Sequence, residues 1–482
     1  MAPTKASLNT LPEELVLAIL SDVHNLSALA KLSLTNHRLH RLGLPFLYRV
    51  FPGRNSELFL RTVAHHPALA AHTRKAVWQQ ERKTVPHISP LEKQHIINRL
   101  NELCVPHGTD LSAHFAKFGK NDDYWYFEVL LLFMPNVEVV QVKDSWLWDD
   151  HHYWFKSLSP FFNPLCVSRL KRVLIEGPMR IENIVPLLTL PSLKVLELTQ
   201  VTVMRREGYR VFQWSVWPAR RVLAERSSAL EVLTLRQSYI DLDLLVPIAL
   251  GIKSLKAFTY EHVPNDLADE AAAEVHRINT AALASCLNMH AHSLEHIRVR
   301  DTQPVDCLFV ADYLFGAPPA DANAQPVFPN LKITDIGPAG EGRPLSNVSF
   351  RNLSPPRALP ASLEILRVKV AEHLEFQPGS VNSWATETSK AESDIELFLH
   401  RLASNLAHEK RFLRVEVVEW NPILGWYPNS LPALQRLYVD VGLRLESVAG
   451  EEADFYDVEP LLVDDESEEG WVVVTDLHLA TK

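Results

Sequence analysis

The sequence predicts an α/β protein: a compact unit of three helices followed by an irregular solenoid, a curved parallel sheet with helices on its outer side. Three observations predict this fold class. A short leucine-rich unit recurs many times beyond about residue 120. The first 50 or so residues instead carry apolar side chains at helical spacing. Glycine is scarce, at 16 residues, while proline is plentiful, at 32, which favours many short elements and argues against nucleotide-binding folds built on glycine-rich loops.

Length and composition narrow the class of protein further. The 482 residues exceed what one compact core normally holds, so we expect two structural units or one elongated array. Apolar residues at 47% and charged residues at 22% indicate a globular chain and exclude a mainly disordered one. The longest apolar stretches, Val129–Met134 and Leu244–Ile252, are far shorter than the ~20 residues of a membrane-spanning helix. The apolar run Leu15–Leu20 follows two glutamates, so it is not read as a signal peptide.

Cysteine usage and charge bear on compartment and partners. Four cysteines without a CxxC pair argue against a disulfide framework or a cysteine zinc site, and favour a cytoplasmic or nuclear location. The net charge of −10 is carried by residues 451–470, which hold ten acidic side chains and no Lys or Arg. The remaining chain is neutral overall, which gives no support to nucleic-acid binding. We expect residues 446–482 to be a flexible acidic tail, or alternatively a competitor for a basic face of the solenoid.

The N-terminal helices have identifiable caps in the sequence. Thr10 and Glu13 fit a capping box for the first helix, Ser27 fits the N-cap of a second, and Asn36 that of a third ending near Gly43. The first helix would carry a wide apolar stripe made of Leu15, Val16, Ile19, Leu20 and Val23. Three short helices cannot bury enough surface alone, so part of this stripe must rest on the remaining chain or on another protein.

The repeated unit has the form L-x-x-L-x-L, with substitutions, and we place its array at residues 121–445, after a helical linker region at 52–120. Its last three residues would form a short strand, and its leading leucine would pack beneath that strand. Helical stretches at 222–228, 241–250 and 268–289 would cover the opposite face, so that each unit buries its core only by stacking on the next. The copies are Val137–Val142, Leu170–Ile175, Leu193–Leu198, Leu230–Leu235, Leu255–Tyr260, Leu294–Val299, Leu363–Val368 and Leu434–Val439, with poorer ones at Leu331–Ile336 and Leu413–Val418.

Residues 8–51 resemble an F-box, through Leu11-Pro12-x-Glu14-Leu15-x-x-x-Ile19-Leu20 and the leucines that follow. The whole layout resembles the F-box/leucine-rich-repeat proteins common in fungi. The resemblance implies docking on a Skp-type adaptor and, through it, on a cullin–RING ubiquitin ligase, with the repeats holding a protein substrate. It implies no catalysis and no cofactor. The adaptor-facing residues it implies are Leu11, Pro12, Leu15, Ile19, Leu20 and Leu29.

The outward strand positions are the candidate substrate face. They include a basic run made of Arg236, Arg298, Arg300, Arg367 and Lys369. Arginine forks suit phosphate and carboxylate, so one hypothesis is an acidic or phosphorylated degron. The alternative is a solvated strand face with cross-strand ion pairs to Glu197 and Glu261.

Other residues are weaker candidates. The aromatic cluster at 146–155 could anchor a peptide, although such clusters more often pack internally. His290, His292 and His296 lack an evident fourth ligand, so we expect structural roles and no metal. GxSxG, P-loop and HExxH motifs are missing from the sequence, which disfavours an enzyme. Two functions remain: the substrate receptor of a ubiquitin ligase, or a protein-binding scaffold in which the F-box is a structural cap.

Overall fold

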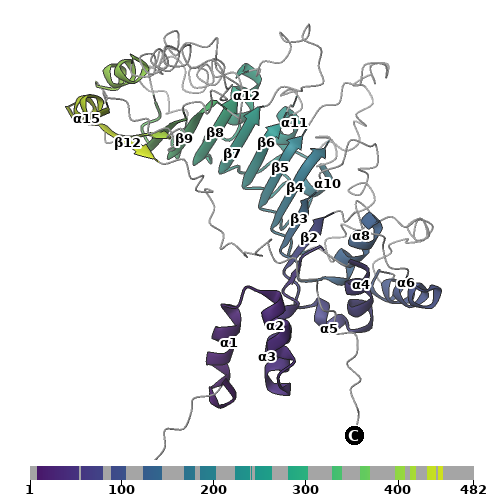
Figure 1. The fold of residues 1–482 in the computed structure, drawn as a ribbon. Helices are drawn as coiled ribbons and strands as arrows, with labels where there is room; N and C mark the ends of the chain where they lie inside the picture. Colours follow the sequence, from purple (N-terminus) through teal and green to yellow (C-terminus); the bar gives the residue numbers. More distant parts are fainter. Residues whose placement is uncertain are drawn as a thin grey trace, which may run out of the picture. The chain divides into compact units, whose positions relative to one another are not determined.

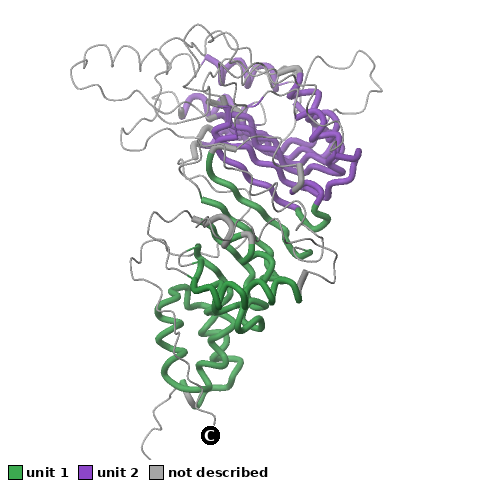
Figure 2. Tube along the Cα trace, turned by 90° about the vertical axis from the view of Figure 1, so that its right-hand side faces the viewer, with its two compact units in different colours: residues 1–177, 190–193, 454–482 green, residues 178–189, 194–453 purple. Residues whose placement is uncertain are grey.

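The structure is a computed structural model. It describes residues 8–53, 56–79, 88–104, 123–143, 168–179, 185–201, 223–238, 240, 245–262, 280–301, 328–338, 359–369, 397–407, 413–418, 431–440 and 443–448. The chain divides into two compact units (Figure 2). The first comprises residues 1–177, 190–193 and 454–482, and the second comprises residues 178–189 and 194–453.

The described strands form a 12-stranded parallel sheet in which the spatial order follows the chain order (Figure 1). This is a solenoid-like α/β fold, as the recurring unit predicted. The strands are β1 (Val50–Phe51), β2 (Lys75–Gln79), β3 (Val139–Lys143), β4 (Arg172–Met179), β5 (Val195–Val201), β6 (Val232–Ser238), β7 (Ala257–His262), β8 (His296–Asp301), β9 (Ile333–Pro338), β10 (Ile365–Lys369), β11 (Leu413–Val418) and β12 (Leu443–Val448).

The residues of the repeated unit occupy the positions in the sheet that their spacing predicted. The leading residue is buried beneath its strand in every copy from Val137 to Leu363, with an exposed fraction of 2% or less. Along β5, Leu196 and Leu198 are buried, whereas Glu197 and Thr199 on the other face are half-buried. The alternation places one side of each strand in the core.

Polar side chains immediately before the leading residue join successive turns, a feature the sequence analysis missed. The Ser192 hydroxyl donates to the Leu170 carbonyl at 2.9 Å, Ser293 to Leu255 at 2.8 Å, and Ser362 to Leu331 at 2.9 Å. The Asn136 amide does the same for Ala71 at 2.7 Å. Each bond satisfies a backbone carbonyl at a bend, where no ladder partner exists.

Charged side chains immediately after the leading residue alternate in sign within the second unit. Glu231 bridges Lys194 at 2.6 Å and Lys256 at 2.7 Å, and Lys332 lies 3.4 Å from Glu295. The lysines are exposed and the glutamates half-buried, so solvent screens each pair and it contributes little to stability. The alternation nevertheless disfavours a register that would place like charges opposite each other.

Three sequence predictions about the array were wrong. Leu434–Val439 is not a strand copy but part of helix α15 (Leu431–Asp440), where Leu434 and Tyr438 are buried one turn apart. The last strand is β12 instead. The sheet also begins before residue 121, because β2 lies inside the region predicted to be helical. Residues 223–231 are not helical. Helix α11 (Leu245–Gly251) overlaps the predicted stretch 241–250, and α12 (Thr280–Asn288) lies within the predicted stretch 268–289.

Among its described residues, the first unit contains four further helices besides the three N-terminal ones. These are α4 (Ser56–His65), α5 (Pro67–Ala70), α6 (Pro90–Cys104) and α8 (Asp123–Phe133). Helices α4 and α6 lie within the region 52–120 that was predicted to be helical. Ser89 and Glu92 form a reciprocal capping box at the start of α6.

Several predictions concern residues outside the described part of the chain. These are the aromatic cluster at 146–155 and the acidic segment at 451–470. No helix among the described residues combines the length and apolarity needed to cross a membrane.

Candidate functional site

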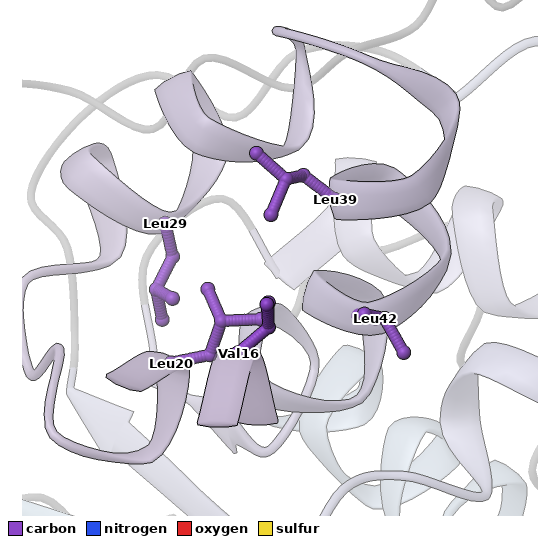
Figure 3. Packing of buried hydrophobic residues seen from close by; sticks show 5 residues of the cluster. All are labelled: Val16, Leu20, Leu29, Leu39 and Leu42. Carbon is purple, nitrogen blue, oxygen red and sulfur yellow. The ribbon is translucent and has the colours of Figure 1, made fainter. Parts of the chain in front are cut away.

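The N-terminal helices build one small hydrophobic core (Figure 3). A short 3-10 turn, Leu8–Thr10, precedes α1 (Glu13–Ser21), α2 (Leu26–Ser33) and α3 (His37–Leu47). The buried residues are Val16, Leu20, Leu29, Leu39 and Leu42, each at most 6% exposed. Leu11, Val23, Leu26, Leu32, Phe46 and Leu47 pack partly buried around them. The sequence-predicted three-helix unit is therefore present.

The helix caps differ from the predicted ones. Helix α1 begins after Pro12 with no side-chain cap, so the predicted Thr10–Glu13 capping box is wrong. Asn25, not Ser27, caps α2, accepting from the Ala28 N–H at 3.0 Å. Asn36 caps α3 as predicted, accepting from the Leu39 N–H at 2.8 Å. Helix α3 runs on to Leu47 rather than ending near Gly43.

Polar contacts fix α1 against α3. The Arg38 guanidinium donates to the Leu11 carbonyl at 2.6 Å, and Glu13 forms an ion pair with Arg41. The acidic first turn of α1 is thereby held against the basic face of α3. Because these contacts lie at the N-terminus of α1, they fix the orientation of its exposed face.

The packing between α2 and α3 depends on a glycine. A Cβ atom added at Gly43 would lie 2.6 Å from the Ser33 hydroxyl oxygen, which is shorter than any normal contact. Gly43 and Ser33 are both buried. Glycine therefore sits at position 43 because the two helices approach closely there, and not because it ends a helix.

Helix α1 leaves apolar side chains exposed next to this core. Leu15 is 52% exposed and Ile19 is 41% exposed, and the exposed Pro12 lies on the same side of the helix. Further exposed leucines are Leu8, Leu17 and Leu34, which the prediction did not include. A globular domain normally buries such side chains, so Pro12, Leu15 and Ile19 together on one side of α1 indicate a contact surface, to which Leu17 on the other side of the helix does not belong.

The six residues implied by the F-box resemblance separate into two groups. Pro12, Leu15 and Ile19 face outward from α1 and can touch a partner. Leu20 and Leu29 are 2% and 3% exposed and point into the core (Figure 3), so they cannot face an adaptor as expected. Leu11 is half-buried against the same core. Leu20 and Leu29 instead hold α1 in place from inside the core. Leu20 points inward although its neighbour Ile19 points outward, because consecutive residues on a helix point in different directions.

The basic run on the strand face is part of a buried charge network in the second unit. The register aligns Arg298 with Asp335, Asp335 with Arg367, and Arg367 with Glu416 across β8 to β11. Arg298 Nε lies 2.9 Å from Asp335 Oδ2, and Arg367 pairs with Glu416. Positive and negative groups thus alternate strand by strand along one row.

Arg300 joins the same network from the next outward position of β8. Its guanidinium lies 3.3 Å from Asp335 and 3.5 Å from Glu261 on the neighbouring strand. Both Arg298 and Arg300 are only 5% exposed. Two arginines therefore share one carboxylate, a charge-assisted arrangement that holds both guanidinium planes in place.

The predicted substrate face is consequently wrong for its central residues. Arg298 and Arg300 are buried and neutralised, so they do not present free forks to a phosphate. The predicted ion pair to Glu261 is present, but the face there is buried and not solvated as that alternative assumed. Arg236 is half-buried, and the side chain of Lys369 lies outside the described residues.

The three histidines considered as metal ligands do not converge. The His290 ring donates from Nε2 to the Ala249 carbonyl at 3.0 Å, and burial lowers the pKa of this imidazole. His292 is exposed, and His296 is half-buried with a pKa also lowered by burial. In the part of the chain that the structure describes, no group of three or more metal-ligating side chains occurs.

Neither a scan against protein-family models nor a search of the curated proteins found a match to this chain. Two surfaces remain as candidates for function: the exposed face of α1, and the outward positions of the strand array.

Proposed function

We propose that this protein is the substrate-recognition subunit of a Skp–cullin–F-box type ubiquitin ligase. The exposed face of α1 docks the adaptor, and the strand array captures a protein substrate. The observation that carries the proposal is the outward position of Leu15 and Ile19, which are about half exposed although the same helix has buried neighbours at Val16 and Leu20. The F-box resemblance of residues 8–51 supplies the kind of partner.

The energetics favour a partner on this face. Burying a leucine or isoleucine side chain fully contributes about 1.5–3 kcal/mol, so covering the exposed halves of Leu15 and Ile19 contributes about 1 kcal/mol each. Central apolar anchors in an interface often cost more than about 2 kcal/mol when truncated. The helix that carries them is already fixed by Arg38 and Arg41, so binding orders little additional backbone.

The mechanism needs no catalytic group in this chain. A receptor that holds a substrate lysine beside a charged conjugating enzyme raises the effective concentration of the two reactants. Adaptor and substrate surfaces need only be separate and specific. The competing function is a binding scaffold in which α1–α3 only cap the sheet. The connection of α3 to β1, the first strand of the sheet, favours this function, because it places the helices next to the end of the array.

Adaptor binding tests the proposal directly. The full chain is co-expressed with a Skp-type adaptor and analysed by size-exclusion chromatography and calorimetric titration. We expect a one-to-one complex that Leu15→Ala together with Ile19→Ala weakens by about 100-fold, which corresponds to about 3 kcal/mol. The far-UV circular dichroism and the Tm of the double variant should match the wild type.

Leu17→Ala is the matched control for this experiment. Leu17 is 37% exposed on the same helix, but about 200° around the axis from Leu15. It should keep most of the adaptor affinity. A chain that ignores the adaptor, or a double variant that binds it normally, would support the scaffold function instead. Ubiquitination of a captured substrate then separates a ligase receptor from a non-ligase adaptor contact.

A further inference from the structure

Strand β12 is the last strand of the open sheet and leaves one edge without a ladder partner among the described strands (Figure 1). Its other edge pairs in parallel with β11 in a regular register, from Leu413 opposite Leu443 to Val418 opposite Val448. Peptide groups in a parallel strand point alternately to the two sides. A row of main-chain donors and acceptors of this kind can bind another extended segment as an added strand.

The phase of the ladder identifies the peptide groups at this edge. In β11, the Arg414 N–H donates back to the Glu364 carbonyl of the preceding turn at 3.0 Å. Arg444 is aligned with Arg414, so its peptide group points toward β11 in the same way. The peptide groups of its neighbours Leu443 and Leu445 therefore point to the open edge.

A side-chain amide takes the place of a strand at one of these groups. Gln435 of α15 donates from Nε2 to the Leu445 carbonyl at 3.5 Å, which is at the long limit for a hydrogen bond. The donor comes from a side chain because the described sheet has no further strand there. A bond of this length is easily exchanged, so the Leu445 carbonyl can accept from the N–H of an added strand.

Few features of β12 protect this edge. Natural edge strands are blunted by prolines, bulges, very short strands or charged side chains. β12 has six residues, without proline or a left-handed residue, and its core side is apolar, with Leu443 and Leu445 at most 5% exposed. Charged side chains remain, because Arg444 and Glu446 occupy its outward positions. These two side chains decide which segments can bind.

Like charges lie opposite each other at this end of the sheet. The register aligns Arg414 with Arg444 and Glu416 with Glu446, whereas the signs alternate from β8 to β11. Glu446 is shared between Arg444 and Arg414, which lies 3.7 Å away. The Arg444 side chain is 74% exposed and carries five N–H donors, so its guanidinium can bind a second carboxylate. An acidic residue on an added strand would restore the alternation of sign.

We propose that the edge of β12 binds an extended segment of the substrate protein as an added strand. The segment directs apolar side chains toward the core beside Leu443 and Leu445, and an acidic side chain toward Arg444. Residues 454–482 of this chain belong to the first unit, so the segment is assigned to another protein. The inference rests on the proposed function in that the segment belongs to the captured substrate.

The probe is a fluorescently labelled heptapeptide with blocked ends, in which valine alternates with threonine and aspartate replaces the central threonine. Two matched peptides carry asparagine or lysine at that position. Each is titrated against the full chain by fluorescence anisotropy. We expect the aspartate peptide to bind about fivefold more tightly than the asparagine peptide, because one exposed ion pair contributes at most about that factor. Arg444→Glu should reverse the order and favour the lysine peptide.

Arg436→Glu is the matched control. Arg436 is exposed on α15, about 100° around the helix from Gln435, so this variant makes the same change of charge away from the edge. It should keep the preference for aspartate. The aspartate peptide with methylated main-chain nitrogens should not bind, because it cannot donate to the ladder. Gln435→Ala should bind the aspartate peptide at least as tightly as the wild type, because the Leu445 carbonyl then has no competing donor.

A wild type that binds none of the peptides at about 1 mM would overturn the inference. Equal affinity for the aspartate and lysine peptides would also overturn it, as would an unchanged preference in Arg444→Glu. A dimer of the chain that the aspartate peptide fails to dissociate would have the same meaning, because a second copy would then occupy the edge.

Adaptor binding is measured on the same variants. Normal adaptor binding in a chain that binds no peptide would remove this inference and leave the proposed function standing. Peptide binding with the expected preference in a chain that ignores the adaptor would leave the β12 site standing and contradict the ligase function.

Discussion

Arg298 and Asp335 form a buried ion pair across strands β8 and β9, with Nε and Oδ2 2.9 Å apart and side chains 6% and 1% exposed. Removing one partner of a buried pair leaves the other charge without compensation, which costs about 3–5 kcal/mol. We therefore expect Asp335→Ala to lower the free energy of unfolding of the second unit by about 3 kcal/mol or more, as measured by urea denaturation. Arg300, which shares this carboxylate, adds to the cost.

Glu295→Ala is the natural control for that variant. Glu295 pairs with Lys332 at 3.4 Å on the exposed edge of the same two strands. An exposed pair contributes at most about 1 kcal/mol, so this variant should be nearly neutral. Equal effects of the two substitutions would show that the inner network is not buried as described.

Gly43 and Ser33 allow a second prediction about the N-terminal helices. Gly43→Ala should destabilise them by about 1–3 kcal/mol, because its new methyl group would meet the Ser33 oxygen at 2.6 Å. Ser33→Ala removes that oxygen, and the remaining Ser33 Cβ atom lies at an ordinary 3.8 Å. The double variant should therefore recover most of the lost stability in a thermal melt. A double variant as unstable as Gly43→Ala would contradict the close approach.

Alanine substitutions at Leu20 and Leu15 should separate an effect on stability from an effect on partner binding. Leu20 is 2% exposed in the core, so Leu20→Ala should cost about 2–5 kcal/mol of stability. Leu15 is 52% exposed, and its replacement by Ala should change stability by less than about 0.5 kcal/mol. Chemical denaturation followed by circular dichroism measures both. Comparable losses would mean that Leu15 is covered within this chain.

His290 should make the second unit sensitive to mild acid. Burial lowers the pKa of its imidazole below the usual 6.5, against a smaller opposing effect of its bond to Ala249. The unfolded chain therefore takes up the proton first as pH falls. The stabilising contribution is complete above about pH 6.5 and is lost as pH falls below it, toward the lowered pKa of the folded state.

The measurement is Tm as a function of pH between about 7.5 and 5.5, which spans the ordinary histidine pKa. Tm should fall with pH in the wild type and fall less in His290→Gln. His296, whose pKa burial also lowers, leaves part of the dependence in place. His292→Gln is the control, since His292 is exposed two residues away and should behave like the wild type.

Periodic features of this protein could be predicted from the sequence because they depend on local spacing. The L-x-x-L-x-L unit located most strands, and its poor copies at Leu331 and Leu413 are strands as well. The same spacing produced a wrong strand prediction at Leu434–Val439. A leucine and a tyrosine four residues apart also fit one face of a helix, which is what forms there. The strand β2 was missed because its five residues have no leading leucine.

The candidate sites show where such reasoning ends. Leu15, Ile19, Leu20 and Leu29 are equally apolar in the sequence, and only packing decides which of them face outward. The pairing of Arg298 with Asp335 joins residues on separate strands, whose register depends on every turn between them. The open edge of β12 has no signal in its residues, since only the topology makes it the last strand of the described sheet.

The sequence by itself therefore determined the fold class, the three-helix unit and the repeated strand, because these follow from hydrophobic periods within short segments. The tertiary structure decided which apolar side chains are exposed, which charges are neutralised, and which strand leaves an open edge. These outcomes depend on contacts between residues far apart in the chain, and no local pattern specifies them.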